Sequence, residues 1–143
     1  MTVPILTSSW RATIDDSRYV RVGVSRSTPR GPKGFRRYAA LEPGPWFKSI
    51  EDPVAWAERY DSEVLSRLEP ARVVADLRAM SDGIKPIVLL CWEPGDGSGG
   101  WCHRALISIW LHERLSVGVR ELGREECGCG RSRPLLPEAL RVK

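Results

Sequence analysis

The stretch KPIVLLCWEPGDGSGGWCHR, residues 85–104, decides the expected fold of this chain. It begins with a continuous run of β-branched and leucine side chains, which is typical of a strand buried on both faces of a parallel sheet. A glycine-rich loop follows, and residues 101–115 then carry apolar side chains at spacings that predict a buried helix. Because residues 117–122 predict another strand, the region 85–122 is a candidate βαβ unit.

The regions upstream of this unit supply further strands and helices. Short apolar runs predict strands at residues 3–6 and 19–24. Asp52 is a good helix N-cap and Pro53 suits a first turn, while Pro70 predicts the start of a second helix that ends near Gly83. The expected fold class is therefore α/β: a small three-layer domain with a mostly parallel sheet and helices on both faces.

The length of 143 residues predicts a single α/β domain spanning residues 1–143. We expect its core within about residues 3–122, and a tail at residues 123–143 that contains cysteine, arginine and proline. No apolar run approaches the roughly 18 residues of a membrane span, and the first residues lack a secretory signal pattern. These observations predict a cytoplasmic protein with reduced cysteines and no membrane partner.

Basic residues gather in one part of the chain. The segment 17–41 holds seven of them and no acid, whereas residues 51–82 hold eight acids and four bases. All but one of the seven are arginine, which favours forked contacts with phosphate over simple solubility; they are Arg18, Arg21, Arg26, Arg30, Lys33, Arg36 and Arg37. A solvated basic loop is the alternative. The overlapping segment 25–46 contains four prolines and three glycines, so we expect it to be irregular and to serve function.

The candidate site lies where the predicted strands end. Ligands of parallel α/β sheets bind at the carboxyl ends of the strands, and a helix N-terminus favours an anion. The strand ending at Cys91 and the helix starting near Cys102 border the glycine loop, and the strand ending at Val24 leads to the arginine stretch. The candidate catalytic residues are His103, Cys102 and Glu93, and the candidate ligand-binding residues are Ser25, Arg26, Arg30, Cys91, Trp92 and Arg104.

Each candidate also has a structural interpretation. Cys91 suits a plain core position, Cys102 a packed thiol, Glu93 an ion pair and Trp92 a core ring. We expect His103 to act in function rather than folding, so that His103→Ala leaves the melting temperature within a few degrees. The pair formed by Cys127 and Cys129 lacks the C-x2-C spacing of structural zinc sites, so we expect no metal and no cofactor.

The sequence resembles a known family in several motifs. A strand ending in LLC-x-E, a variable loop and then CHR opening a helix is similar to the bacterial domain-of-unknown-function family 488. The segments ILTSSW, VGVSRSTPRGPKGF and AERYDSEVLSRL resemble other parts of that family in the same order, over roughly residues 4–122. Two features depart from the family: its usual aspartate in the second strand is replaced around Gly23, and the loop before Trp101 is long and glycine-rich. The resemblance implies an α/β fold and a polar site built from these motifs, without a settled reaction.

Three function classes remain open at this point. The first is a protein with a basic, anion-binding cleft that acts on or binds a phosphate-bearing ligand, either a nucleotide or a nucleic acid. If this protein is an enzyme, the candidate residues His103, Cys102 and Glu93 favour a hydrolase. The second is a non-catalytic nucleic-acid-binding module that uses the arginine stretch. The third is an accessory protein-interaction domain in which the CHR helix is only architecture.

Overall fold

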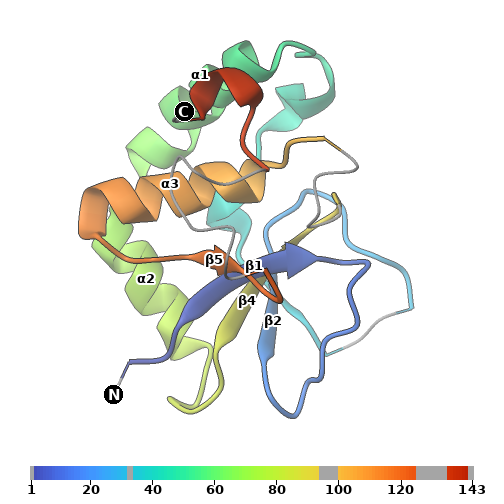
Figure 1. The fold of residues 1–143 in the computed structure, drawn as a ribbon, viewed down its shortest axis with the longest axis vertical. Helices are drawn as coiled ribbons and strands as arrows, with labels where there is room; N and C mark the ends of the chain where they lie inside the picture. The colour runs from blue at the N-terminus through green and yellow to red at the C-terminus, as the bar shows by residue number, and fades with distance from the viewer. Residues whose placement is uncertain (1, 32–33, 94–99, 125–134, 142–143) are drawn as a thin grey trace.

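The computed structural model describes residues 2–31, 34–93, 100–124 and 135–141. Its centre is a sheet of five parallel strands in the order β3-β2-β4-β1-β5 (Figure 1). The strands are β1 (Ile5–Ser9), β2 (Val20–Gly23), β3 (Arg36–Arg37), β4 (Ile87–Cys91) and β5 (Arg120–Glu121). The helices are α1 (Pro53–Glu63), α2 (Pro70–Ala79) and α3 (His103–Leu115), and short 3-10 turns lie at residues 39–41, 45–48, 65–67 and 138–140.

The prediction of a small α/β domain is confirmed. Every strand pair in the sheet is parallel, and the central strand β4 is buried along its whole length, as the run of leucine and β-branched residues indicates. The unit β4-α3-β5 forms within the region 85–122, but β1 lies between its two strands in the sheet. The crossover therefore skips one strand.

The helices begin where local sequence signals place them. Asp52 caps α1, because its side chain accepts a hydrogen bond from the Ala55 backbone N–H at 2.9 Å. Pro53 and Pro70 occupy the first helical positions of α1 and α2, where a missing N–H leaves no intrahelical bond unmade. The second helix ends at Ala79, a few residues before the expected stop at Gly83.

The two faces of the sheet are covered differently. One face carries Ile87, Leu89 and Cys91, which belong to the core cluster that also takes in buried side chains of all three helices. On the opposite face Val88 and Leu90 are equally buried but lie outside that cluster. Gly23 pairs with Leu90 and so shares that face, and a Cβ at Gly23 would lie 2.7 Å from the Trp10 ring. Among the described residues, the Trp10 ring from the β1–β2 loop therefore covers Gly23, on a face where the sequence predicted a helix.

The segment 25–46 is more regular than its proline and glycine content indicates. It contains β3 and the 3-10 turn at residues 39–41, and a second turn starts at Pro45. Side chains of α1 fix the position of this segment. The Tyr60 hydroxyl donates to the Leu41 carbonyl at 2.6 Å. The Trp56 indole donates to the carbonyl of Phe47, directly after the segment, at 2.9 Å. Tertiary contacts therefore supply the order that local propensity does not.

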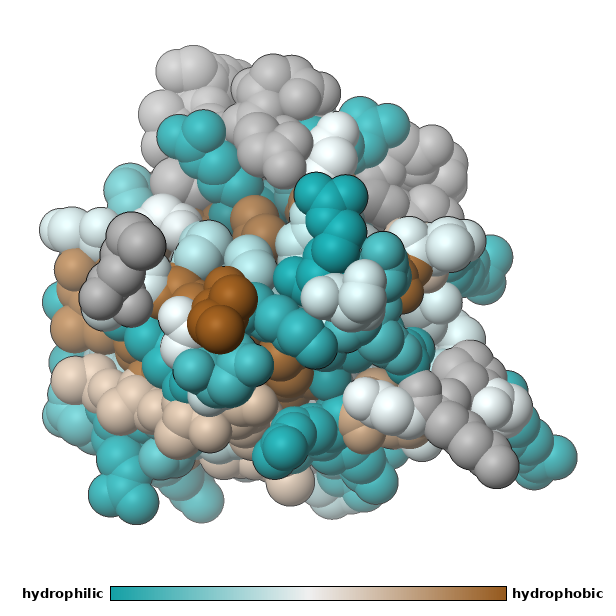
Figure 2. Space-filling view, turned by 90° about the horizontal axis from the view of Figure 1, so that it is seen from below, coloured by the Kyte–Doolittle hydropathy of each residue, from teal (hydrophilic) through white to brown (hydrophobic). Residues whose placement is uncertain are grey.

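The C-terminal region returns to the core. Leu135 and Leu136 are buried, and the Leu135 carbonyl accepts a hydrogen bond from the Cys102 backbone N–H at 2.8 Å. Core residues therefore occur beyond position 122, inside the segment expected to be a tail. In the face shown in Figure 2, hydrophobic side chains lie scattered among hydrophilic ones; among the described residues Ile84 is the exposed large hydrophobic side chain. None of the helices described here is long and apolar enough to cross a membrane.

Candidate functional site

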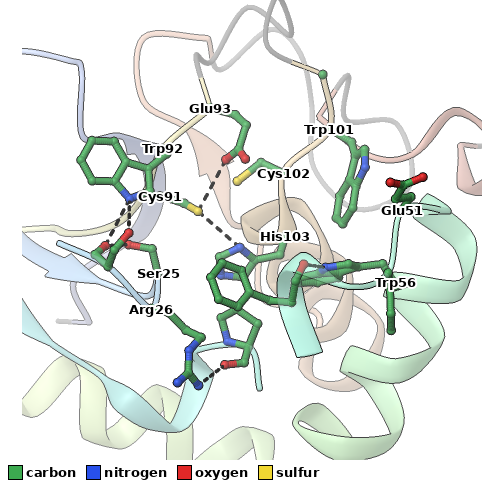
Figure 3. Close-up of a pocket in the computed structure, with 15 residues that line it drawn as sticks. Ser25, Arg26, Glu51, Trp56, Cys91, Trp92, Glu93, Trp101, Cys102 and His103 are labelled. Carbon is green, nitrogen blue, oxygen red and sulfur yellow. Dashed lines mark hydrogen bonds between the residues drawn. The ribbon is translucent and has the colours of Figure 1, made fainter. Parts of the chain in front are cut away.

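A pocket of about 350 Å³ opens at the carboxyl edge of the sheet (Figure 3). It lies over the carboxyl ends of β2 and β4 and the start of α3, at the edge where parallel α/β sheets bind ligands. The pocket is lined by Ser25, Arg26, Ser27, Pro43, Phe47, Ile50, Glu51, Trp56, Cys91, Trp92, Glu93, Gly100, Trp101, Cys102 and His103.

The floor of the pocket holds two thiols and an imidazole. Cys91 ends β4, Cys102 is the N-cap of α3, and His103 is the first residue of that helix. All three are buried, and Cys91 Sγ lies 3.3 Å from His103 Nδ1. Figure 3 shows the Glu93 carboxylate turned toward the same group; its Oε2 lies 3.6 Å from Cys91 Sγ. The sequence-predicted catalytic residues His103, Cys102 and Glu93 are therefore close together.

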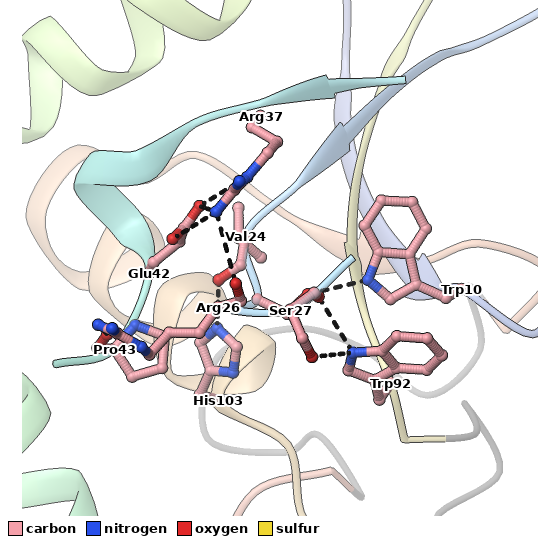
Figure 4. Close-up of polar contacts among 10 residues, drawn as sticks. Trp10, Val24, Arg26, Ser27, Arg37, Glu42, Pro43, Trp92 and His103 are labelled. Atoms are coloured by element: carbon pink, nitrogen blue, oxygen red, sulfur yellow. Dashed lines mark hydrogen bonds and ion pairs between the residues drawn. The ribbon is translucent and has the colours of Figure 1, made fainter. Parts of the chain in front are cut away.

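The orientation of His103 is set by its second ring nitrogen. Nε2 lies 2.9 Å from the Val24 carbonyl oxygen, which can only accept a hydrogen bond (Figure 4). Nε2 therefore carries a proton, and in the neutral ring Nδ1 keeps a free lone pair that faces Cys91 Sγ. The ring also packs against Tyr60 and Trp56, with centroid separations of 5.5 and 5.9 Å. His103 is thus a buried group held by the fold, not the surface residue assumed for the His103→Ala expectation.

Arg104 lies behind the pocket and does not line it. Its side chain is fully buried and forms a two-pronged ion pair with Glu121 at 3.0 and 2.7 Å. Nη2, one of the two nitrogens of this ion pair, also donates to the Glu93 carbonyl at 2.7 Å, and Nη1 reaches Cys102 Sγ at 3.1 Å. Glu121 in turn accepts a hydrogen bond from the Thr7 hydroxyl at 2.7 Å. The structure therefore gives Arg104 a place beside the Cys102 sulfur, away from the position expected for a ligand contact.

These contacts shift the acidity of the floor residues. Burial by itself raises the pKa of the Cys102 thiol, but the hydrogen bond with Cys91 and the Arg104 charge outweigh it and hold that pKa well below its usual value. The hydrogen bond with Cys102, together with burial, raises the pKa of Cys91. Burial and the neighbouring Cys102 raise the pKa of Glu93 to about 7. Of the two thiols, Cys102 is therefore the more acidic.

One wall of the pocket is formed by the residues that follow β2 and by Trp92; Figure 4 shows their polar contacts. The Trp92 indole donates to the Ser27 hydroxyl at 3.1 Å and to its carbonyl at 3.2 Å. Arg26 donates to the Pro43 carbonyl at 3.1 Å, and its guanidinium carbon lies 5.8 Å from the centre of the Phe47 ring. Ser25, Arg26 and Trp92 therefore line the pocket as the sequence predicts, whereas Arg30 is exposed and does not.

Part of the basic stretch is neutralised by acids that flank it in the sequence. Arg21 pairs with Asp16 at 2.6 Å, and Arg37 pairs with Glu42 at 2.8 Å. Among the described residues Arg26 is the only member of that stretch that lines the pocket. Two of the seven basic residues are therefore paired with acids, and Arg26 faces the pocket.

Several residues of the site carry no local sequence signal. Trp56 and Phe47 line the pocket from segments that precede Cys91 by many residues, and Glu121 reaches Arg104 from the last strand. An aromatic residue on a helix is ordinarily a core residue, so only the three-dimensional arrangement identifies these two rings. For Glu121, the signal in the sequence was an acidic residue within a predicted strand, which indicates a buried ion pair but not its partner. Cys127 and Cys129 lie outside the described residues.

Within the described part of the chain, Cys91, Cys102 and His103 form the group whose ligand atoms could hold a metal ion. Comparison of the chain with family models, with curated proteins and with solved structures finds no match.

Proposed function

We propose that this protein is a hydrolase that acts on a phosphate-bearing small molecule of the nucleotide type. One observation carries the proposal: Cys91, Cys102, His103 and Glu93 converge at the floor of a single pocket whose wall carries a guanidinium, that of Arg26. Titratable groups that lie together in a cleft, with pKa values shifted by burial and by one another, mark a candidate functional site.

The shape and walls of the pocket favour a small ligand with a flat ring. A volume of about 350 Å³ falls within the range of about 300–1,000 Å³ that is usual for small-molecule sites. The rings of Trp92, Trp101 and Phe47 line it and offer surfaces on which a base can stack. Arg26 supplies forked N–H donors for a phosphate, and the Ser27 hydroxyl lies on the same wall.

The reaction that fits these groups is hydrolysis of a phosphate ester or anhydride. The oxygen of a water molecule forms a bond to phosphorus, and the bond between phosphorus and the leaving oxygen breaks. Glu93, which lies over the floor, takes the proton of the attacking water and returns a proton to the leaving oxygen. Arg26 holds the phosphate and balances its negative charge throughout.

A panel of nucleoside mono-, di- and triphosphates, with the unphosphorylated nucleosides as reference, tests the substrate class. We expect at least one phosphorylated compound to be hydrolysed, as measured by chromatography of the products. Arg26→Ala should weaken its binding or turnover by at least about tenfold. The matched control is Arg30→Ala, which removes an exposed arginine outside the pocket and should have little effect. Equal effects of the two changes, or no turnover of any compound, would contradict the proposal.

Glu93→Gln tests the role of the carboxyl group. The amide preserves the shape of the side chain but cannot carry the proton, so the rate should fall by about 10²- to 10⁴-fold while ligand affinity changes little. A Glu58→Gln variant is the control, because Glu58 is an exposed residue of α1 outside this pocket, and the rate should change little. Full activity of Glu93→Gln would remove Glu93 from the mechanism.

A further inference from the structure

The floor of the pocket has the dimensions of a tetrahedral metal site. The Sγ atoms of Cys91 and Cys102 and a ring nitrogen of His103 all lie within 4.8 Å of one another, and Cys91 Sγ is 3.3 Å from His103 Nδ1. Zinc bonds of about 2.3 Å to sulfur and 2.0–2.1 Å to nitrogen place tetrahedral ligand atoms about 3.6–3.8 Å apart. Small movements of buried side chains would therefore bring the three atoms to bonding distance of one ion.

The surroundings of His103 support the use of Nδ1 as a ligand. Metal-bound histidines almost always donate their other ring N–H to a carbonyl, a carboxylate or water, which fixes the tautomer and the ring orientation. Here Nε2 faces the Val24 carbonyl at 2.9 Å, so the free lone pair is the one at Nδ1. The fold thus turns the correct atom toward the two sulfurs before any ion is bound.

The surroundings of Cys102 support its use as a thiolate ligand. Arg104 reaches Cys102 Sγ at 3.1 Å, and its position is fixed by the ion pair with Glu121. Arginine beside a thiolate stabilises the anion that a metal requires, and it stays in place because its remaining donors are occupied. Arg104 and Glu121 are both buried, so the Cys102 sulfur is held in one orientation.

We propose that Cys91, Cys102 and His103 bind one Zn²⁺ ion at the floor of the pocket and leave its fourth position open. Two thiolates and an imidazole favour zinc among the abundant divalent ions, since magnesium and calcium prefer oxygen ligands. Glu93 is outside this group of three, although its carboxylate lies 3.6 Å from Cys91 Sγ. Three protein ligands with one open position are the arrangement of catalytic zinc sites, in which water occupies the fourth place.

A bound zinc ion would give the pocket a cofactor that the sequence does not predict. The C-x-C spacing of Cys127 and Cys129 argued against a zinc site, but the ligands proposed here come from a strand end and the helix start that faces it. The role of the ion in hydrolysis, as the site that activates the attacking water, rests on the proposed function. Metal binding itself does not.

The first experiment uses the unmodified full chain. Protein expressed without added metal and purified in a phosphine reductant, with no chelator, should contain about one zinc per chain by elemental analysis. After removal of zinc, Co²⁺ should produce the visible absorption of a tetrahedral site together with a sulfur-to-cobalt charge-transfer band. Neither readout depends on activity or on a variant. A chain that binds neither ion, or whose Cys91 and Cys102 instead form a disulfide in the folded protein, overturns the proposal.

Variants then assign the ligands. His103→Gln keeps an N–H donor for the Val24 carbonyl but lacks Nδ1, so it should remain folded while zinc affinity falls by about 100-fold or more. Cys102→Ser should abolish the charge-transfer contribution of that sulfur. Two controls are matched: His112→Gln changes the exposed histidine of α3, and the double change Cys127→Ser with Cys129→Ser removes the other cysteine pair.

The outcomes separate the two proposals. Retained zinc affinity in His103→Gln, or its loss only in the Cys127 and Cys129 variant, would overturn the assignment of the floor residues. Stoichiometric zinc with no turnover of any phosphorylated compound would leave the metal site standing and refute the hydrolase. Turnover that continues unchanged in metal-free protein would refute the role of the ion in hydrolysis and leave the hydrolase standing.

Discussion

Single side chains at the floor of the pocket meet structural and chemical demands at once. His103 donates to Val24 through one ring nitrogen and faces Cys91 through the other, while its ring packs on Tyr60. Arg104 holds Glu121 with one part of its guanidinium and touches Cys102 with another. Because these groups are buried, a substitution at either position will change the stability of the fold as well as the chemistry of the site.

His103→Ala should lower the free energy of unfolding by about 1–3 kcal/mol, because it leaves the Val24 carbonyl without its buried donor. The matched change His112→Ala, at an exposed position of the same helix, should cost about 0.5 kcal/mol or less. Urea denaturation of the metal-free proteins measures both values. Equal and small effects would mean that His103 contributes to folding no more than a surface residue does.

Glu121→Gln should lower the free energy of unfolding by about 3–5 kcal/mol, because Arg104 would keep its buried charge without a partner. The control is Glu63→Gln, which breaks an exposed i,i+4 pair with Arg59 and should cost about 0.5 kcal/mol. Replacing both Arg104 and Glu121 by apolar residues of similar size should recover much of the loss. Denaturant midpoints and slopes provide the measurement, and a cost below about 1 kcal/mol for Glu121→Gln would show that the buried charge finds another partner.

At the scale of elements, one contact joins the β3 region to α2. Tyr38, directly after β3, donates its hydroxyl proton to Asp76 of α2 at 2.8 Å. Asp76 also pairs with Arg72 one turn earlier in the same helix at 2.9 Å. A strand of only two residues has few ladder bonds of its own, so this contact helps to hold β3 at the edge of the sheet.

Tyr38→Phe should therefore lower the free energy of unfolding by about 1 kcal/mol at neutral pH. Burial and the bond to Asp76 raise the pKa of Tyr38 to about 12, against 10 for a free tyrosine. The folded state thus favours the neutral hydroxyl: its stabilising effect is complete below pH 10 and is lost as the pH rises from about 10 to 12. Thermal unfolding at several pH values should show a smaller decline over this window for Tyr38→Phe than for the unmodified chain. An identical decline in the two proteins would contradict the assignment.

At the scale of the whole molecule, the arrangement of charge separates a small-ligand site from a nucleic-acid surface. The chain carries a formal net charge of +4, and its densest basic stretch includes two arginines that are already paired with Asp16 and Glu42. Arg26 is the basic side chain among the described residues that lines the pocket. Such a distribution favours one phosphate held in a pocket over many phosphates bound along a surface.

A salt series with a labelled single-stranded oligonucleotide tests this distribution. Each phosphate contact with a single strand contributes about −0.7 to the slope of log K against log salt concentration. We expect a weak interaction with a slope between 0 and about −2, because two arginines of the stretch are already paired with acids and Arg26 is the one that lines the described pocket. A slope of about −4 or steeper, together with submicromolar affinity, would favour the non-catalytic nucleic-acid-binding module. No binding of either the oligonucleotide or a nucleotide would favour the accessory domain.

The sequence alone determined the features that depend on neighbours along the chain. The apolar run that ends at Cys91 predicts β4, and this strand forms. Asp52 with Pro53 predicts the start of α1, and Pro70 predicts the start of α2; both helices begin at these residues. The same reasoning brought Cys102, His103 and Glu93 to one edge of the sheet, because a strand end and the helix after it border the same loop.

The tertiary structure decided the features that depend on segments distant in the sequence. The Nδ1 atom of His103 lies 3.3 Å from Cys91 Sγ, because the carbonyl of Val24, directly after β2, holds the opposite ring nitrogen. Arg104 turns inward, since Glu121 offers a buried carboxylate from the last strand. Pairing across such separations depends on burial and strand order, and a pattern of neighbouring residues carries no information about either. Local sequence therefore predicts which groups reach the edge of the sheet, and only the packed fold decides which atoms of those groups meet.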